Sequence, residues 1–585
     1  MRNVLCLVLL VPILALAAGK TESVTALSPE TGVMSSAPAT VPVDQGQVNI
    51  PPKALVGSID TIGGTCYDWW ANGPIYRFLT NSTAYGLHAL WMYSADIQGT
   101  SFADRNMRYN YYDYATRTWN WVDPDYMQSG VNTFTHKAGY GNLDADPLTG
   151  AAFVGGHYTG TGGIAPKVAK DAAPGTGIFD YADGEPVLGV TQWPPISVGQ
   201  DGSMHIFPIT AGYVLSYSHI AAGQWPTFAA PVSPIEPSPG FPTHNLAASK
   251  HSGKVALVWE ISGDVPEDAY MQTSTDNGVT WTSPLQIPTP TAYGGDTLTA
   301  FHITSLHPFY DSDDRLNIVA NFVPQVRDTV WIIPAQIWHY CPDNDPQWNR
   351  IQIAGCAPEN LGAAVGYNAV YACRPSIGED NDGHLFVAWE QFDSANVEPI
   401  TSRLRADIFA AGSGDGGKTW STPVKLTEAG THSMRFPSIV DLALEGAPGP
   451  DTVCIIYEDD EMAGFLVQGE GSGTNNAVVL QKILATDVGL AENGPGVTPV
   501  KVELSATPNP FGGRTRISYA LPRAGDVSLV VYDAVGRPVQ TLASGHREAG
   551  RYNATWNAGN AAAGVYFYTL TTGRTSTTKK LILAD

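Results

Sequence analysis

Arginine and glutamate side chains stand at corresponding places in several short apolar runs of this chain. Arg374 begins the phrase Arg-Pro-Ser-Ile, Arg435 begins Arg-Phe-Pro-Ser-Ile, and both phrases are typical of short strands. Three other apolar runs end in an acid, at Glu260, Glu390 and Glu458. Because a guanidinium pairs bidentately with a carboxylate, arginines gathered beside acids would suit the recognition of an anionic sugar.

These residues can meet only if the chain closes into a ring of sheets. In such a ring, residues that begin an inner strand and residues that end the following strand emerge on one face, around a central mouth. The mouth candidates are therefore Arg374, Arg435, Glu260, Glu390 and Glu458, with His244, Asp459, Asp460 and Glu461 beside them. A purely structural role stays open for each glutamate, because a strand end is also solvated or bonded to backbone N–H groups.

A short apolar run that follows a turn returns roughly every 50–70 residues, which is the sign of repeated sheets with loop insertions. Seven such runs occur, at 86–92, 150–154, 202–207, 253–260, 315–322, 383–390 and 452–458. They predict seven sheets. Six is the alternative, because the first or last run could complete a shared sheet.

The phrase Ser-x-Asp-x-Gly-x-Thr-Trp occurs twice, each time between two β-like runs. Its residues are Ser274, Asp276, Gly278, Thr280 and Trp281 in the first copy, and Ser413, Asp415, Gly417, Thr419 and Trp420 in the second. An aspartate accepts backbone N–H groups in a tight turn, glycine takes a conformation that side chains forbid, and tryptophan packs beneath. The phrase resembles the Asp-box, or BNR repeat, of sialidase-like β-propellers. The resemblance implies an all-β propeller over residues 52–490.

Composition agrees with short strands joined by turns. The 585 residues include 60 glycines and 43 prolines, only 15% are charged, and the formal net charge is −23. A chain of this length is expected to form two or more domains. Its negative charge argues against nucleic acid or an anionic membrane as the main partner.

The N-terminus reads as a secretory signal peptide over residues 1–17, with Arg2 before the apolar run Val4 to Leu16. Residues 18–50 are rich in Ser, Thr, Pro and Ala and are typical of a disordered spacer. No later segment approaches about 18 unbroken apolar residues, so we expect no transmembrane span after signal removal.

The chain changes character near residue 491. Residues 498–585 contain short alternating strands with Gly and Asn turns, which predicts a small Ig-like β-sandwich. The phrases Pro508-Asn-Pro-Phe511, Tyr532-Asp-x-x-Gly-Arg537, Gly564-Val-Tyr-Phe-Tyr568 and Lys579-Lys-Leu-Ile-Leu583 closely resemble, in order, the C-terminal sorting domain of type IX secretion. The resemblance implies a bacterial protein that uses the type IX machinery and is secreted or held at the outer-membrane surface.

Other possible sites carry weaker signals. Asp380 and Asp382 lie in an oxygen-rich turn in which calcium is conceivable, although Asp-Gly is ordinary hairpin chemistry; no other cofactor is expected. Aromatic residues at Tyr67, Trp69 and Trp70 could stack on sugars or fill the core. Cys341 and Cys356 could close a local hairpin, and Cys373 and Cys454 could be core thiols.

The favoured function is a secreted or cell-surface binding module for glycan or protein ligands. A sialidase-like glycoside hydrolase is one alternative, and a structural outer-surface protein is another. The sialidase family uses an arginine triad whose first member stands in a Phe-Arg-Ile-Pro phrase early in the catalytic domain. Here the nearest phrases come late, and the early arginines Arg77, Arg105, Arg108 and Arg117 stand in no phrase of that kind. That absence favours binding over catalysis.

Overall fold

The computed structural model describes two compact units, residues 1–490 and 491–585. Within them the described residues are 55–71, 75–160, 163–210, 214–232, 243–261, 268–288, 301–326, 329–330, 332–355, 364–428, 430–445, 450–490, 504–521, 525–534, 536–547, 550–559, 561–572 and 575–584. The expected signal peptide and spacer lie outside these residues.

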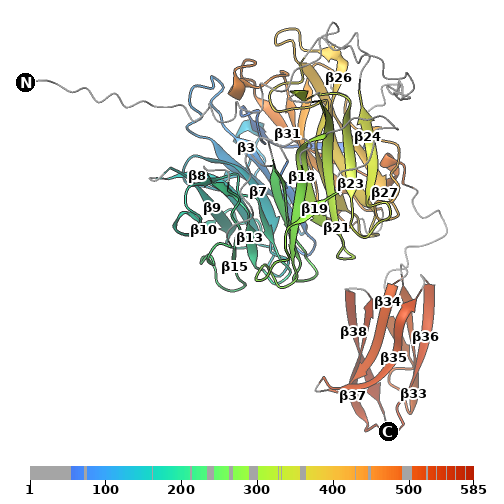
Figure 1. Cartoon of the computed structure of the whole chain (residues 1–585). Helices are drawn as coiled ribbons and strands as arrows, with labels where there is room; N and C mark the ends of the chain where they lie inside the picture. The colour runs from blue at the N-terminus through green and yellow to red at the C-terminus, as the bar shows by residue number, and fades with distance from the viewer. Residues whose placement is uncertain are drawn as a thin grey trace, which may run out of the picture. The chain divides into compact units, whose positions relative to one another are not determined.

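The described part of the first unit is built of antiparallel sheets (Figure 1). Four of them, in chain order, contain β2 (Leu79–Ser82), β3 (Gly86–Tyr93), β4 (Asn106–Asp113), β5 (Thr118–Trp119) and β6 (Val131–Asn132); β7 (Ala138–Ala145), β8 (Ala152–Gly160), β9 (Gly163–Asp171) and β10 (Phe179–Asp183); β12 (Ile196–Val198), β13 (Met204–Ile206) and β15 (Ser218–Ile220); and β16 (His244–Ala248), β17 (Val255–Ile261), β18 (Asp268–Ser274) and β19 (Leu285–Ile287).

Three more sheets follow in the same unit. They contain β20 (Phe301–Tyr310), β21 (Leu316–Val326), β22 (Thr329–Val330), β23 (Ala335–Tyr340) and β24 (Trp348–Ala354); β25 (Ala372–Glu379), β26 (Leu385–Val397), β27 (Leu404–Ser413) and β28 (Val424–Lys425); and β29 (Ser433–Ile439), β30 (Val453–Asp460), β31 (Asn476–Ile483) and β1 (Ser58–Thr65). Smaller elements are the pair β11 (Thr191–Gln192) and β14 (Ile209–Thr210), the helix α2 (Glu185–Leu188) and the 3₁₀ turns η2 (Tyr126–Gln128), η4 (Leu466–Gln468) and η5 (Ala485–Val488).

Neighbouring sheets touch through their first strands. The contacts run from β2 to β7, β12, β16, β20, β25 and β29 in turn, and β2 also contacts β30. Between the first and last of these sheets, the Phe78 N–H donates to Ser438 Oγ at 2.9 Å and Thr80 Oγ1 donates to Asp441 Oδ2 at 2.7 Å. The N-terminal strand β1 pairs with β31 near the C-terminal end of the unit, from Ser58 opposite Lys482 to Thr65 opposite Asn476.

Each of the seven apolar runs chosen from the sequence contributes the second strand of a different sheet: β3, β8, β13, β17, β21, β26 and β30. In the sheet that holds Arg374, β25 to β28 follow one another as neighbours in chain order. These runs are nearly continuously apolar since both faces of each sheet are covered by other sheets.

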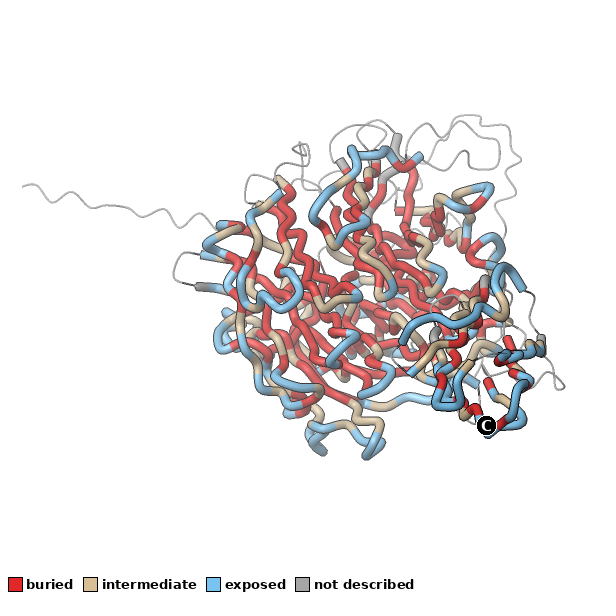
Figure 2. Tube along the Cα trace, turned by 90° about the horizontal axis from the view of Figure 1, so that it is seen from below, coloured by how far each residue is buried: buried red, intermediate tan, exposed pale blue. Residues whose placement is uncertain are grey.

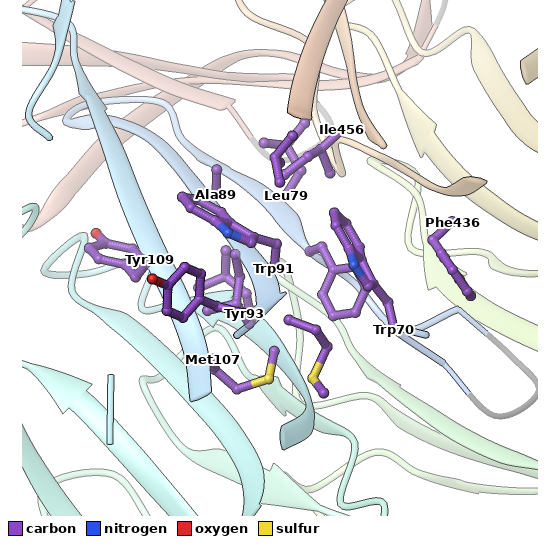
Figure 3. Packing of buried hydrophobic residues seen from close by; sticks show 14 of the residues in the cluster. Trp70, Leu79, Ala89, Trp91, Tyr93, Met107, Tyr109, Phe436 and Ile456 are labelled. Atoms are coloured by element: carbon purple, nitrogen blue, oxygen red, sulfur yellow. The ribbon is translucent and has the colours of Figure 1, made fainter. Parts of the chain in front are cut away.

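The core of the unit lies between sheets rather than on one layer. Figure 2 shows the buried strand segments gathered inside the unit, with exposed residues concentrated in the turns. In the largest cluster, Trp70 stacks on Phe436 with ring centroids 6.0 Å apart, and Trp91 lies near Ala89 and Met107 (Figure 3). Tryptophan and phenylalanine bury large areas, so these contacts contribute strongly to stability.

The two Ser-x-Asp-x-Gly-x-Thr-Trp phrases form the same turn. Asp276 Oδ1 accepts the Thr280 N–H at 2.8 Å and Oδ2 accepts Thr280 Oγ1 at 2.6 Å, while Ser274 Oγ accepts the Gly278 N–H at 2.9 Å. Asp415 and Ser413 hold Thr419 and Gly417 in the same way, at 2.9, 2.6 and 2.9 Å.

Each turn lies against the preceding sheet. A Cβ on Gly278 would fall 1.8 Å from Tyr217 Oη, just before β15, and a Cβ on Gly417 would fall 2.0 Å from His339 Cε1 on β23. The turns therefore connect sheets as well as strands.

The cysteines with described side chains are buried free thiols. Cys373 and Cys454 are core thiols, as predicted. Cys341 is free as well, so the bridge considered to Cys356, which lies outside the described residues, does not form. Cys341 is buried beside the charged side chains of Arg315, Asp311 and Asp343.

The second unit has two antiparallel sheets that share one core. One contains β32 (Leu504–Thr507), β33 (Arg514–Leu521) and β36 (Gly550–Asn557), and the other contains β35 (Pro538–Arg547), β34 (Gly525–Tyr532), β37 (Gly564–Thr572) and β38 (Thr575–Leu583). Trp556 is the centre of this core, against Phe511 and Tyr566 at 5.3 and 5.0 Å.

The close fit of Gly278 gives a stability test. Gly278→Ala adds a methyl group both to a backbone with φ +78° and into Tyr217, so we expect the free energy of unfolding to fall by about 3 kcal/mol. Gly223 has φ +72° with nothing within 4 Å, so Gly223→Ala is the control and should cost only about 1 kcal/mol. Urea unfolding followed by tryptophan fluorescence measures both, and equal losses would contradict the docking role of the turn.

Candidate functional site

Four of the predicted mouth residues lie on adjoining sheets, near the beginning of the first strands. Glu390 does not end its strand, as expected from the sequence, because β26 continues to Val397 in its pairing with β27. Arg374 is on β25 and Arg435 on β29, while Glu390 is on β26 opposite Cys373 and Glu458 is on β30 opposite Arg435. Each first strand has an irregularity here, and Arg374 and Phe436 have positive φ of 55° and 57°. This backbone turns consecutive side chains toward the same place.

Arg374 and Arg435 are both bound to Glu390. Arg374 Nη1 donates to Glu390 Oε1, and Arg435 Nε donates to Glu390 Oε2 at 3.3 Å, the same oxygen that accepts the Phe436 N–H at 2.7 Å. Arg374 Nη2 donates to the Asn368 carbonyl at 2.9 Å. The two guanidiniums therefore clamp one internal carboxylate.

This ion cluster is closed to solvent. Arg374 and Arg435 are 1% exposed and Glu390 is 0% exposed. Burial acts to raise the pKa of Glu390, but the guanidiniums of Arg435 and Arg374 outweigh it and lower that pKa to about 2. Rings of Phe436, Phe392 and Phe465 cover the guanidinium of Arg435 at 5.3, 4.9 and 4.6 Å. The two arginines therefore have a structural role, as buried partners of Glu390.

Three further carboxyl groups lie near Arg435 and stay protonated more readily than usual. Burial, and then the charge of Asp460 and Asp68, raises the pKa of Glu458 well above its ordinary value. Burial and the charge of Asp68 also raise the pKa of Asp460 well above its ordinary value. Burial raises the pKa of Asp68 to about 7, although hydrogen bonds from the N–H groups of Leu466 and Val467 act to lower it. We call Asp68, Glu458 and Asp460 the acid cluster.

The other predicted mouth residues are spread out. Glu260 ends the second strand of another sheet and is 0% exposed; His244 begins β16 and approaches the Trp193 carbonyl at 2.9 Å. Asp459 pairs with His432 at 2.7 Å, and Glu461 is exposed. Their burial and partners are consistent with separate structural roles.

The carboxylate of Asp380, a weak calcium candidate, is engaged within its turn. Its Oδ1 accepts the N–H groups of Asp382 and His384 at 3.0 and 2.8 Å, and its Oδ2 contacts His384 Nδ1 at 2.8 Å. In the described part of the chain, no group of three or more His, Cys, Asp or Glu side chains is arranged to hold a metal ion. Asp380 shapes the hairpin.

A second group of polar side chains lies at the same end of the first strands. We call Tyr67, Arg105, Tyr140 and His157 the tyrosine–arginine cluster. The two tyrosine hydroxyls are 2.5 Å apart, and Arg105 Nη1 donates to Tyr67 Oη at 3.2 Å. Arg105 Nη2 lies 3.4 Å from His157 Nε2, and Arg105 Nε donates to the Ala138 carbonyl at 3.0 Å. Tyr140, on β7, has a positive φ of 48°, at the same irregularity in β7 as Arg374 in β25.

Aromatic rings continue from this cluster toward the ion cluster. Trp69 meets Tyr140 edge to face at 5.8 Å and Tyr367 at 5.5 Å. The Trp69 Nε1 atom is buried without a hydrogen-bond partner. His157 packs on Tyr140 at 4.9 Å and on Trp193 at 6.2 Å. We call Trp69, Tyr140, Trp193 and Tyr367 the aromatic floor.

Sequence reasoning found part of this group. Tyr67 and Trp69 were noted as aromatic candidates, and Arg105 was noted as an early arginine in no familiar phrase. Tyr140 and His157 were missed, because each lies in a run whose register is set by the irregularity in β7, between Gly139 and Asn142. The phrase Gly139-Tyr-Gly141 was the one available signal, since glycines flank a tyrosine where a strand departs from regular pairing.

Comparison with known families finds one match. Residues 505–584 match the secretion system C-terminal sorting domain. The protein is therefore exported by type IX secretion and is secreted or held at the outer-membrane surface. No helix among the described residues is both long and apolar enough to cross a membrane.

Solved structures with a related arrangement are glycan-active or glycan-binding proteins. A polysaccharide lyase of the PL25 family, an ulvan lyase, aligns with 12% identity over 72% of this chain and 95% of its own, with a TM-score of 0.39. The Hadza microbial sialidase Hz136 aligns with 11% identity over 65% and 74%, TM-score 0.33. The six-bladed β-propeller lectin of Aleuria aurantia aligns with 13% identity over 60% and 96%, TM-score 0.30. No curated protein is significantly similar in sequence.

The clamp around Glu390 predicts a large loss on neutralisation. Glu390→Gln would leave two buried guanidiniums without an anion, so we expect the free energy of unfolding to fall by about 3–5 kcal/mol. Glu461→Gln, at an exposed carboxylate, is the matched control and should change it by less than about 0.5 kcal/mol. Urea unfolding of the full chain distinguishes them, and a small effect at Glu390 would show that the arginines are held by other groups.

The acid cluster predicts a stability that falls as pH rises. An acid whose pKa is higher in the folded state binds more protons there than in the unfolded state. Burial raises the pKa of Asp68 from its ordinary 3.8 to about 7. The loss of folding stability therefore begins as the pH rises above about 3.8 and is complete above about 7. We expect Asp68→Asn, which mimics the protonated acid, to flatten the dependence of the melting temperature on pH between about pH 4 and pH 7. Asp123→Asn, at an exposed aspartate, should leave the slope unchanged; a slope preserved in Asp68→Asn would contradict this assignment.

Proposed function

We propose that the first unit is a seven-bladed Asp-box β-propeller and that it serves as a glycan-binding module on an exported protein. The successive contacts of seven first strands, with β1 paired to β31, support a closed ring of blades. The Ig-like sandwich of residues 498–585 would act as the sorting domain that carries the propeller across the outer membrane.

The observation that carries the binding role is the aromatic floor. Sugars bind proteins by laying their C–H faces on aromatic rings while hydroxyls meet a few polar groups. Trp69 offers a ring with an N–H that has no partner, and Tyr367 and Trp193 beside it are partly exposed. Tyr67 and Tyr140 add two hydroxyls within the same patch.

A sialidase-like hydrolase is less well supported. That chemistry needs guanidiniums free to grip the substrate carboxylate, whereas Arg374 and Arg435 are clamped on Glu390 and only 1% exposed. A purely structural outer-surface protein would need no partly exposed rings such as Tyr367 and Trp193 in this place. The binding module is therefore the function that the geometry supports best.

Glycan-array binding of the full chain, followed by calorimetry on the strongest hit, tests this function. Trp69→Ala removes the central ring of the floor and should weaken binding by about tenfold or more, since stacking is worth roughly 1–2 kcal/mol. Trp225→Ala is the matched control, because Trp225 bonds Asp180 at 3.0 Å outside the floor. No glycan bound, or equal binding by both variants, would overturn the proposal. Release of sugar from fluorogenic sialosides by the wild type would instead favour the hydrolase.

A further inference from the structure

Among the arginines at the mouth, Arg105 differs from Arg374 and Arg435 because it has no acidic partner. Its contacts are to the Ala138 carbonyl, Tyr67 Oη and His157 Nε2, and its guanidinium lies over the rings of Tyr67 and Tyr140 at 5.5 and 5.2 Å. Within the described part of the chain it forms no ion pair. A guanidinium has five N–H donors, so one on each terminal nitrogen of Arg105 is unused.

The surroundings add a second positive charge, at Lys137. Lys137 is near enough that burial and the charge of Arg105 lower its pKa, and its Nζ donates to the Ser101 carbonyl at 2.7 Å. Burial, followed by Arg105 and Lys137, lowers the pKa of His157 well below its ordinary value, so His157 is neutral. The carboxylates that face Lys137 are Asp96 and Asp104, and neither pairs with Arg105. Asp96 is taken up by the N–H groups of Ser101 and Phe102, at 3.0 and 2.9 Å, and Asp104 by Ser94 Oγ and the Ala95 N–H, at 2.6 and 2.7 Å.

A second observation points into the same place. His157 is 4% exposed, and its Nδ1 has no hydrogen-bond partner. A buried polar nitrogen without a partner is unfavourable unless a ligand or water completes it. A largely desolvated cation without a counter-ion is more costly still. Both costs disappear if an anionic group that can also accept a hydrogen bond enters the cluster.

We propose that Arg105, Tyr67, Tyr140 and His157 form a subsite for the anionic group of an acidic sugar, a carboxylate or a sulfate. This inference rests on the proposed glycan-binding function and names its ligand class. The anion accepts the two unused N–H donors of Arg105 and a tyrosine hydroxyl, while the sugar ring lies on the aromatic floor through Tyr140. Either oxyanion matches the fork of a guanidinium, so the source of the anion is left to experiment.

Calorimetry with matched saccharides separates the possibilities. The probes are an oligogalacturonide tetrasaccharide, its carboxyl-reduced neutral form, and a sulfated neutral tetrasaccharide. Wild-type protein should bind at least one anionic probe about tenfold more tightly than the neutral one, and Arg105→Gln should abolish this preference. Arg350→Gln, at an exposed arginine of β24, is the matched control. Equal affinity for charged and neutral probes, or full anion binding by Arg105→Gln, would overturn the proposal.

A thermal-shift series keeps the subsite separate from the proposed function. Inorganic sulfate should raise the melting temperature of the wild type and of Arg350→Gln but not of Arg105→Gln. Without ligand, Arg105→Gln should melt at or above the wild-type temperature, since it removes an uncompensated cation; a large drop would assign Arg105 a structural role and count against the subsite. Neutral glycan binding without anion preference would leave the glycan function standing and refute this inference. A sulfate effect that depends on Arg105, with no glycan bound, would support the anion subsite and refute the proposed glycan-binding function.

Discussion

The pairing of β1 with β31 is the constraint on which the rest of the first unit depends. It joins Ser58–Thr65 to Asn476–Ile483, and Lys482 Nζ reaches Asp60 Oδ2 at 2.5 Å across the pair. The entropy of closing so long a loop grows only with the logarithm of its length, so a few strand hydrogen bonds and packed side chains can offset it.

The same pairing determines the position of the segment that follows β1. Residues 66–71 leave β1 directly into the end of the unit where first strands begin, which is how Tyr67, Asp68 and Trp69 come to lie among residues hundreds of positions later.

The segment after β1 connects two clusters of opposite character. On one side, Asp68 accepts the N–H groups of Leu466 and Val467 and joins the acid cluster around Arg435. On the other, Tyr67 meets Arg105 and Tyr140. At the ion cluster both arginines have a carboxylate partner, because Glu390 lies between them. At the tyrosine–arginine cluster Arg105 has no carboxylate partner among the described residues. The presence of an arginine is therefore a poor indicator of a ligand-binding site unless its partners within the protein are known.

The sequence predicted strands better than sites, and the reason is physical. An apolar run such as 383–390 reports its own burial, so the second strand of each sheet could be located from local pattern alone. The glycine turns at 278 and 417 were equally local, since their hydrogen bonds span five residues. The partner of Arg374 could not be found in this way, because Glu390 reaches it only after β25 and β26 pair around an irregularity. Arg105 belongs to no recognisable sequence motif, and its proposed role follows from the lack of an acidic partner among the described residues. An absence of that kind is visible only in three dimensions.

A net charge of −23 and a cationic subsite are compatible. Exposed charges are screened beyond about 8–10 Å at physiological ionic strength, so the field felt inside a partly buried cluster is set by its nearest groups. Around Arg105 those groups are two tyrosines, a neutral histidine and a lysine, and the low polarizability of their surroundings strengthens each interaction. The distant negative surface affects how fast a polyanion arrives more than how firmly one anionic sugar is held. Overall charge therefore argues against nucleic acid as the main partner far more strongly than it argues against a single acidic residue of a glycan.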